Sequence, residues 1–210
     1  MNPTQFVELL SEISFPHVFN PYRDLCGDHD HAKSPAIRRL NLQRYLEAVV
    51  ACGVESVWLG RDCGYRGGRR TGIALTDEIH LTALETQFGI GGMAKATVGV
   101  PVKERTATEV WKILREIDKK VFLWNVFPFH PYEGGKPMSN RRHTSREFNE
   151  CKELLYCLLN WLRPKKIVAL GIDAHKEVLQ LGFRVSSVRH PSYGGQFEFA
   201  GAIRNLYDQS

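Results

Sequence analysis

The sequence lacks any apolar run long enough to cross a membrane, and it has no internal repeat, low-complexity stretch or Cys-x-x-Cys pair. A membrane-spanning helix needs about 20 mostly apolar residues, so we do not expect a membrane protein. The first residues have neither the basic start nor the apolar run of a secretory signal, and the five cysteines are odd in number. We therefore expect a cytoplasmic protein with free thiols. In a bacterium it would be associated with the nucleoid, and in another cell with the equivalent intracellular compartment.

The length of the chain favours one folded unit. Its 210 residues, 43% of them hydrophobic, are enough for one well-buried core and few for two. We expect a single domain over residues 1–210, in which residues 1–33 form an N-terminal helix and an irregular extension. The 28 Lys and Arg residues exceed the 23 Asp and Glu residues and give a net charge of +5, which suits a polyanionic partner without identifying one.

Strand and helix patterns alternate through the interior of the chain. Short apolar runs that end in glycine or polar residues predict strands at 55–60, 121–126, 165–171 and 184–188. Amphipathic segments with capping residues predict helices at 4–12, 34–52, 76–88, 106–117, 144–162, 173–181 and 197–207. This alternation predicts an α/β fold of three αβα layers with a central four-stranded parallel sheet.

A loop rich in glycine and arginine follows the first of these strands. It reads GRDCGYRGGRRTG over residues 60–72, and Asp62 is its first acid. Parallel α/β sheets bind ligands at the carboxyl ends of their strands, and arginine suits phosphate. More basic side chains follow two later strands: Arg141, Arg142, His143, Arg189 and His190. We expect three basic loops to form one patch at this edge.

Three polar side chains should also meet there, one from each of three strand ends. They are Asp62, Asn125 and His190. The amide can pair with a pyrimidine-like edge through one donor and one acceptor, the imidazole can stabilise negative charge on a departing oxygen, and the carboxylate can position water or stabilise a cation. These residue types together predict an active site.

The segment at residues 26–31 reads CGDHDH and contains several groups able to bind a metal. His29 and His31, with Asp28 and Asp30 beside them, could hold an ion, yet no second cluster at a familiar spacing follows. We expect a polar surface loop here and no metal site.

Four motifs, in order along the chain, resemble those of the uracil-DNA glycosylase superfamily. GRDCGY at 60–65 resembles the first motif, which reads GQDPYH in the common uracil-DNA glycosylases and GEAPG or GxNPG in other branches. LWN at 123–125 resembles the strand that ends in the uracil-binding asparagine, and LG at 170–171 resembles the strand end before the penultimate helix. RHPS at 189–192 resembles the second catalytic motif, HPS. The resemblance extends from about residue 34 to the C-terminus.

The resemblance implies a monofunctional DNA glycosylase of base excision repair, which hydrolyses the N-glycosidic bond of uracil or a related modified base. Asp62 would orient the water that attacks the sugar C1′, and His190 would stabilise the charge on the departing base. Asn125 would hydrogen-bond the base. The base pocket would also contain Gly64, Tyr65, Leu75 and Phe127. The chemistry needs neither a metal nor an organic cofactor, because one acid near the sugar and one donor near the base oxygen suffice.

The resemblance also implies DNA as the partner, single- or double-stranded, bound by a monomer that flips the target base out of the stack. The residues expected to contact DNA are Arg66, Arg69, Arg70, Arg141, Arg142, Ser192, Tyr193 and Gly194.

The sequence departs from the family pattern at three places. Leu75 stands where relatives carry an aromatic residue that stacks on the base, so stacking should be weaker. Gly64 aligns with the tyrosine that rejects the thymine methyl group, and Arg61 stands where other branches carry Gln or Glu. The excised base is therefore open among uracil, mismatched thymine, hypoxanthine and another modified base.

Two other functions stay open. The first is a non-catalytic reader of damaged or modified bases, which the missing aromatic residue favours and the pair Asp62 and His190 disfavours. The second is an N-glycosidase of free nucleosides or nucleotides on the same fold. The arginine-rich loops favour a polymer over a monomer, because one nucleotide offers few phosphates.

Overall fold

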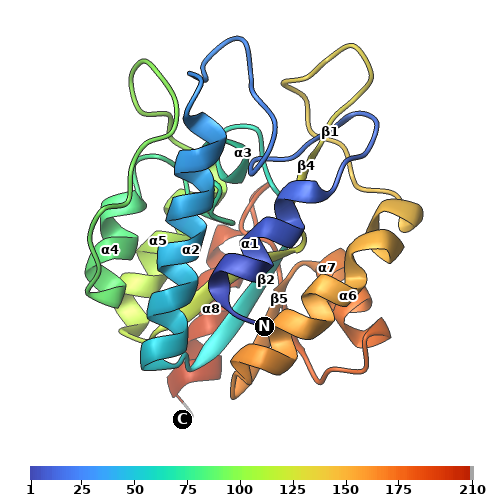
Figure 1. Ribbon diagram of the computed structural model, residues 1–210. Coiled ribbons are helices and arrows are strands. Elements are labelled where there is room, and N and C mark those ends of the chain that lie inside the picture. Colours follow the sequence, from blue (N-terminus) through green and yellow to red (C-terminus); the bar gives the residue numbers. More distant parts are fainter. Residues whose placement is uncertain (209–210) are drawn as a thin grey trace.

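The central sheet of this computed structural model, which describes residues 1–208, has four parallel strands in the order β3-β2-β5-β6. The strands are β2 (Ser56–Asp62), β3 (Val121–Phe127), β5 (Lys166–Leu170) and β6 (Ser186–Val188). Helices surround this sheet (Figure 1). The predicted α/β fold with a four-stranded parallel sheet is confirmed.

The crossover helices divide between the two faces of the sheet. The chain moves from β2 to β3 through α5 (Arg105–Ile117), and it moves in the other direction through α6 (Ser145–Leu162) and α7 (Ile172–Gln180). Right-handed crossovers in opposite directions put α5 on one face and α6 and α7 on the other. The last helix, α8 (Gln196–Asp208), contacts α5 and packs on Trp58, whose indole N–H donates to Tyr207.

The remaining helices are α1 (Pro3–Glu12), α2 (Ser34–Cys52), α3 (Gly68–Thr71) and α4 (Leu81–Phe88). Of these, α1 and α2 lie in front of the sheet in the view of Figure 1, and α3 and α4 lie above it and at its side. Tyr45 of α2 reaches the free edge of β3, where its hydroxyl accepts from the Leu123 N–H and donates to the Val121 carbonyl. These bonds satisfy backbone groups that an edge strand otherwise leaves unpaired.

Helix starts depend on capping, and one predicted start was wrong. Thr144 and Glu147 form the expected capping box at the start of α6. The helix expected from residue 76 begins only at Leu81. Asp77 is fully buried and accepts hydrogen bonds from the backbone N–H groups of Ile79, His80 and Glu104, so it forms a buried turn instead of a helical turn.

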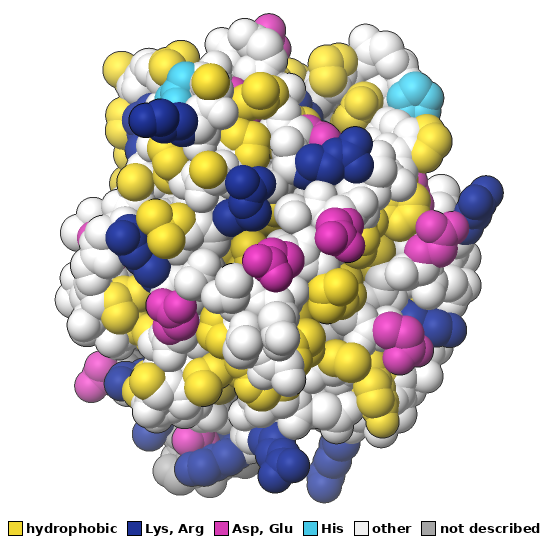
Figure 2. Space-filling view, in the orientation of Figure 1, with side chains coloured by type: hydrophobic (Ala, Val, Ile, Leu, Met, Phe, Trp, Pro, Cys, Tyr) yellow, Lys and Arg dark blue, Asp and Glu magenta, His cyan; other side chains and the backbone are white. Residues whose placement is uncertain are grey.

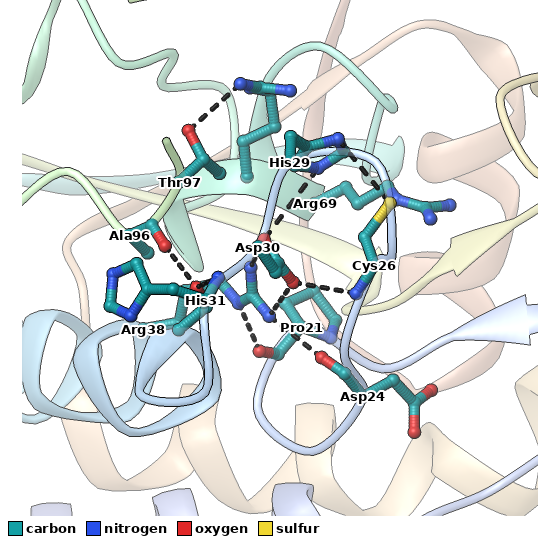
Figure 3. A network of polar contacts seen from close by, with 12 residues as sticks. Pro21, Asp24, Cys26, His29, Asp30, His31, Arg38, Arg69, Ala96 and Thr97 are labelled. Carbon is teal, nitrogen blue, oxygen red and sulfur yellow. Dashed lines mark hydrogen bonds and ion pairs between the residues drawn. The ribbon is translucent and has the colours of Figure 1, made fainter. Parts of the chain in front are cut away.

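The N-terminal extension is held against α2 by one buried arginine (Figure 3). The Arg38 guanidinium pairs with Asp30 at 2.8 Å and donates to the carbonyls of Pro21 and Asp24. Earlier in the extension, β1 (Val18–Phe19) pairs with β4 (His130–Pro131), which follows β3. The extension therefore contacts the segment after the second strand of the sheet.

The pairing of β2 fixes where its last residues lie. Gly60 pairs with Asn125 and Asp62 with Phe127 on one side, and Leu59 pairs with Ala169 on the other. Asp62 is thus the last residue of the strand, two positions beyond the predicted end at residue 60. Because all four strands are parallel, their carboxyl ends meet at one edge.

Charge on the face shown in Figure 2 is mixed, with acidic and basic side chains interspersed. The net positive charge therefore does not gather on this side. Within residues 1–208, no helix is both long and apolar enough to cross a membrane.

Replacing Arg38 by methionine should strongly destabilise the protein. The side chain is fully buried, and its loss leaves the Asp30 carboxylate buried without its cation. Breaking a buried ion pair from one side costs about 3–5 kcal/mol, which urea unfolding would measure. The matched change Arg146→Met removes an exposed arginine paired with Glu150 and should cost less than about 1 kcal/mol. Equal losses in the two variants would contradict the structural role of Arg38.

Candidate active site

A cavity of about 590 Å³ opens at the carboxyl ends of β2, β5 and β6. The strand ends contribute Asp62, Gly171 and His190, and loops from other parts of the chain complete its walls. Of the residues predicted for the site, the structure brings these together around the cavity: Asp62, Gly64, Leu75, Arg141, His190, Ser192 and Tyr193.

Asp62 reaches the cavity from the last position of β2, and only 7% of its side chain is exposed. One carboxylate oxygen accepts from Nδ1 of His143, and the other is 2.6 Å from Nε of Arg61. Two cationic groups thus compensate the charge of a nearly buried carboxylate. Each oxygen keeps a further lone pair, with which it can accept a hydrogen bond from water.

His143 is almost fully buried between two acids. Its Nε2 is 2.7 Å from the Glu177 carboxylate, and its Nδ1 contacts Asp62. Burial lowers the pKa of His143, but the hydrogen bonds and charges of Asp62 and Glu177 outweigh burial and raise it to about 9. Neither His143 nor Glu177 was predicted as a site residue, because neither belongs to a motif and their contact depends on the folded positions of α7 and the loop before α6.

His190 follows β6 and is neutral at physiological pH. Burial, with a smaller contribution from Arg61, lowers its pKa to about 4. Its Nδ1 accepts from the Ser192 backbone N–H at 3.2 Å and lies 2.7 Å from the Ser192 hydroxyl. Since Nδ1 must be an acceptor, the single ring proton resides on Nε2. The neutral ring can therefore offer an N–H donor to an oxygen in the cavity.

Glu104 is a cavity residue that the sequence motifs did not reveal. It lies at the N-terminus of α5, and its carboxylate contacts the space beside Gly64 and Gly67, where a Cβ at either glycine would collide with it. Burial and the nearby Asp77 raise the pKa of Glu104 to about 7, although Arg66 opposes the shift. At neutral pH this group is thus divided between its acid and carboxylate forms.

Asn125 lies behind the cavity wall and is 1% exposed. In the amide orientation that satisfies both ends, its nitrogen donates to the Trp124 carbonyl at 3.3 Å and its oxygen accepts from the Cys63 backbone N–H at 3.2 Å. A Cβ at Gly60 would collide with Asn125 and come within 3.0 Å of Leu75, so these two side chains meet over the glycine. Leu75 itself lines the cavity in a left-handed conformation, with a φ of 54°, which is strained for leucine.

Two other predicted base-pocket residues lie outside the cavity lining. Phe127 is fully buried and packs between Phe129 and the His143 ring. Tyr65 is half-buried, and its backbone N–H donates to the Asn140 side chain. Phe127 lies near Asp62 because β2 pairs with β3, and Tyr65 because it follows three residues later in the chain, but neither side chain lines the cavity.

Two of the arginines predicted to contact DNA are buried, and this corrects the sequence-based expectation. Arg69 donates to Nδ1 of His130 at 2.9 Å and stacks on Phe19. Arg70 pairs with Glu78 at 3.1 Å. All four residues of α3 are buried, so both guanidinium groups bind other groups of the protein and are not exposed to phosphate.

The other residues predicted to contact DNA keep some exposure. Arg66 and Arg142 are exposed, and Arg141 is half-buried and pairs with Glu147 at 2.6 Å. Tyr193 is 93% exposed at a φ of 53°, next to Gly194. The loop after His190 therefore presents an aromatic side chain to solvent beside the cavity.

The segment at residues 26–31 is engaged in internal contacts (Figure 3). Asp30 binds Arg38 and the Cys26 backbone N–H, and Nδ1 of His29 is 3.5 Å from the Cys26 sulfur. Over residues 1–208 no group of three or more His, Cys, Asp or Glu side chains is arranged to hold a metal ion.

Glu104→Gln should change how stability depends on pH. The folded-state pKa of Glu104, about 7, exceeds its ordinary value of 4.5, so the folded state holds the extra proton. Wild-type stability should therefore fall as pH rises from 4.5 to 7, while the glutamine variant lacks this loss. Urea unfolding of both proteins should show the variant gaining relative stability across this window. A difference that stays constant with pH would contradict the shift.

Comparison with known proteins supplies the family. The family model described as the uracil DNA glycosylase superfamily matches residues 57–205. Among solved structures, SMUG2 from Pedobacter heparinus is similar over 100% of both chains, with a TM-score of 0.63 and 16% sequence identity. No curated protein sequence matches at a significant level. Because the family match covers more than half of its length, the chain belongs to the uracil DNA glycosylase superfamily.

Proposed function

We propose that this protein is a monofunctional DNA glycosylase that hydrolyses the N-glycosidic bond of uracil or a related modified base. One observation carries the proposal: Asp62 and the neutral His190 line the same cavity at the carboxyl edge of the sheet. Membership in the superfamily and the fold shared with SMUG2 support it.

Asp62 serves the sugar side of the reaction. When the bond between C1′ and the base breaks, the sugar acquires positive charge. The Asp62 carboxylate stabilises that charge and orients a water toward C1′ through its free lone pairs. The water oxygen bonds to C1′, and the leaving base takes up a proton.

His190 serves the base side. The base departs with negative charge on a carbonyl oxygen, and the Nε2–H of His190 donates to that oxygen. A neutral donor suits this task because its pKa near 4 keeps it in one protonation state throughout the neutral range. Ser192 fixes the ring orientation through Nδ1.

Asn125 reads the base edge in this proposal. Leu75 lines the cavity, Asn125 does not, and the two side chains meet over Gly60, so in this proposal a base reaches Asn125 where Leu75 moves aside. The strained backbone of Leu75 favours such a movement. The Glu104 carboxylate, and not a tyrosine side chain, occupies the space beside Gly64, which keeps uracil, mismatched thymine and hypoxanthine all possible substrates.

DNA binds across the mouth of the cavity. Arg66, Arg141 and Arg142 contact phosphates, and the backbone at Ser192 and Gly194 approaches the flipped nucleotide. Tyr193 is nearly fully exposed and enters the space that the flipped base leaves.

One observation favours a second function, recognition of a damaged base without cleavage. The aliphatic Leu75 replaces a stacking aromatic residue and screens Asn125 in the absence of DNA. A reader would keep tight, salt-sensitive DNA binding and release no base from any substrate.

Asp62→Asn and His190→Ala should each abolish most base excision while sparing DNA affinity. Each removes charge stabilisation at one end of the breaking bond, which is worth about 10²–10³-fold in rate. The assay uses labelled oligonucleotides that carry uracil, hypoxanthine, mismatched thymine or an oxidised pyrimidine, with hot alkali to cut abasic sites. Arg204→Gln, on the exposed side of α8, serves as the control and should excise like wild type. Full activity of Asp62→Asn on the cleaved substrate would contradict the proposed role.

Asn125→Asp should change base preference. The change replaces an amide donor by an acceptor while keeping the shape of the side chain, so a base that offers a donor at this edge should gain relative to uracil. The ratio of kcat/KM values for two bases measures the change. An unchanged ratio would remove Asn125 from base recognition.

A further inference from the structure

Six charged side chains form a closed ring beside the cavity, with acids and bases alternating. Around the ring they are Asp62, Arg61, Asp173, Arg142, Glu177 and His143. Arg61 lies 2.6 Å from Asp62 and 2.9 Å from Asp173. Arg142 lies 3.1 Å from Asp173 and 3.7 Å from Glu177. His143 closes the ring between Glu177, at 2.7 Å, and Asp62.

The ring joins three separate parts of the fold. Asp62 and Arg61 end β2, Asp173 and Glu177 occupy the first two turns of α7, and Arg142 and His143 precede α6. Asp62, Arg61 and Asp173 line the cavity, and of the six only Asp62 acts on the reacting atoms in the reaction proposed above. The others connect it to two neighbouring elements.

With both acids ionised, hydrogen-bond chemistry requires His143 to be charged. Both ring nitrogens face carboxylates, and an ionised carboxylate can only accept. Both nitrogens must therefore donate, which only the imidazolium form can do. With His143 charged, three cations balance three anions.

Stability alone does not explain such a ring. His143 and Glu177 are buried, and buried ion pairs rarely stabilise a fold more than apolar side chains of the same volume. Arg142, which offers the longest contact, is also exposed to solvent. What the ring does achieve is to fix one orientation of the Asp62 carboxylate.

We propose that His143 and Glu177 are positioning residues that hold Asp62 in its catalytic orientation, and that they do so only while His143 carries its proton. This inference rests on the proposed glycosylase function. Loss of the proton leaves the ring with a single N–H for two acids, so the Asp62 carboxylate is no longer held in one orientation and can turn away from the water it orients.

The proposal gives excision an alkaline limit. Charged groups face His143 from β2 and α7, and from its own loop: Asp62, Arg61, Glu177, Asp173 and Arg142. On its remaining sides it contacts the rings of Phe127 and Phe148, while Glu147 on α6 pairs with Arg141 instead. The two acids that touch it therefore decide its protonation.

Glu177→Gln is the discriminating variant. It keeps an oxygen that can accept from His143 but removes the negative charge. An opposite charge at this distance raises a pKa by about 1–3 units, so the alkaline limb of kcat should move down by about that amount in pH. The readout is the pH profile of kcat and not the KM for DNA, because Glu177 also lies 3.7 Å from Arg142 of the proposed DNA surface.

His143→Gln is the second variant. It keeps an amide donor for Asp62 but cannot contact both acids at once, and misplacement of a catalytic group by about 1 Å can lower kcat about 10²-fold. The alkaline limb should disappear, since no titrating group remains at this position. Glu116→Gln, which alters a surface ion pair with Arg204, is the matched control and should leave the profile unchanged.

NMR of labelled histidine in the wild type and in Glu177→Gln follows His143 without reference to activity. A wild-type His143 that titrates at its ordinary value near 6.5 would overturn the inference even if excision is observed. An active wild type whose limb stays fixed in both variants would overturn the positioning role and leave the glycosylase function intact. The third outcome is a wild type that excises no base, in which His143 is charged and its pKa falls in Glu177→Gln. That outcome would overturn the proposed function and with it the catalytic purpose of the ring.

Discussion

A nearly buried carboxylate at the end of a parallel strand is the constraint on which the site depends. The pairing of β2 with β3 and β5 carries Asp62 to the edge where the cavity opens, and only 7% of its side chain remains exposed. A charge removed from water in this way requires compensation. Arg61 at the end of β2 and His143 before α6 supply it. Each also pairs with an acid on α7, so three elements are linked around one carboxylate.

Two histidines near the cavity show how burial and neighbours decide charge. His190 is buried beside Arg61 and hydrogen-bonds to the neutral Ser192, and burial with a smaller contribution from Arg61 lowers its pKa to about 4. His143 is buried between two acids, and its pKa rises to about 9. At neutral pH the first is an uncharged donor at the cavity surface and the second is a cation behind Asp62. The same side chain therefore suits two different tasks within one site.

The sequence predicted the layers of the fold and the strand ends well, because both depend on local patterns. The four strands were visible as apolar runs, and Thr144 with Glu147 marked the start of α6 as expected. The grouping of Asp62 and His190 followed from the geometry of a parallel sheet. These features need only neighbouring residues or a rule of topology.

What the sequence could not predict depends on contacts between distant segments. Arg69 and Arg70 stand in a glycine-rich loop and were expected at the surface, but Phe19 and Glu78 bind them inside. Glu104 enters the cavity only because Gly64 and Gly67 leave space for its carboxylate. His143 belonged to a run of basic residues until α7 placed Glu177 against it. Each case depends on a partner far away in the chain.

The central claim is that water attacks C1′ in the cavity between Asp62 and His190 and releases a free base. The most direct measurement incubates a uracil-containing oligonucleotide with the protein in ¹⁸O-labelled water, then analyses both products by mass spectrometry, with borohydride added in a parallel reaction. The account predicts free base, an unbroken abasic strand with one ¹⁸O atom at C1′, and no protein trapped on DNA. A protein–DNA adduct trapped by borohydride, or no base released from uracil or from any other base tested, would contradict it.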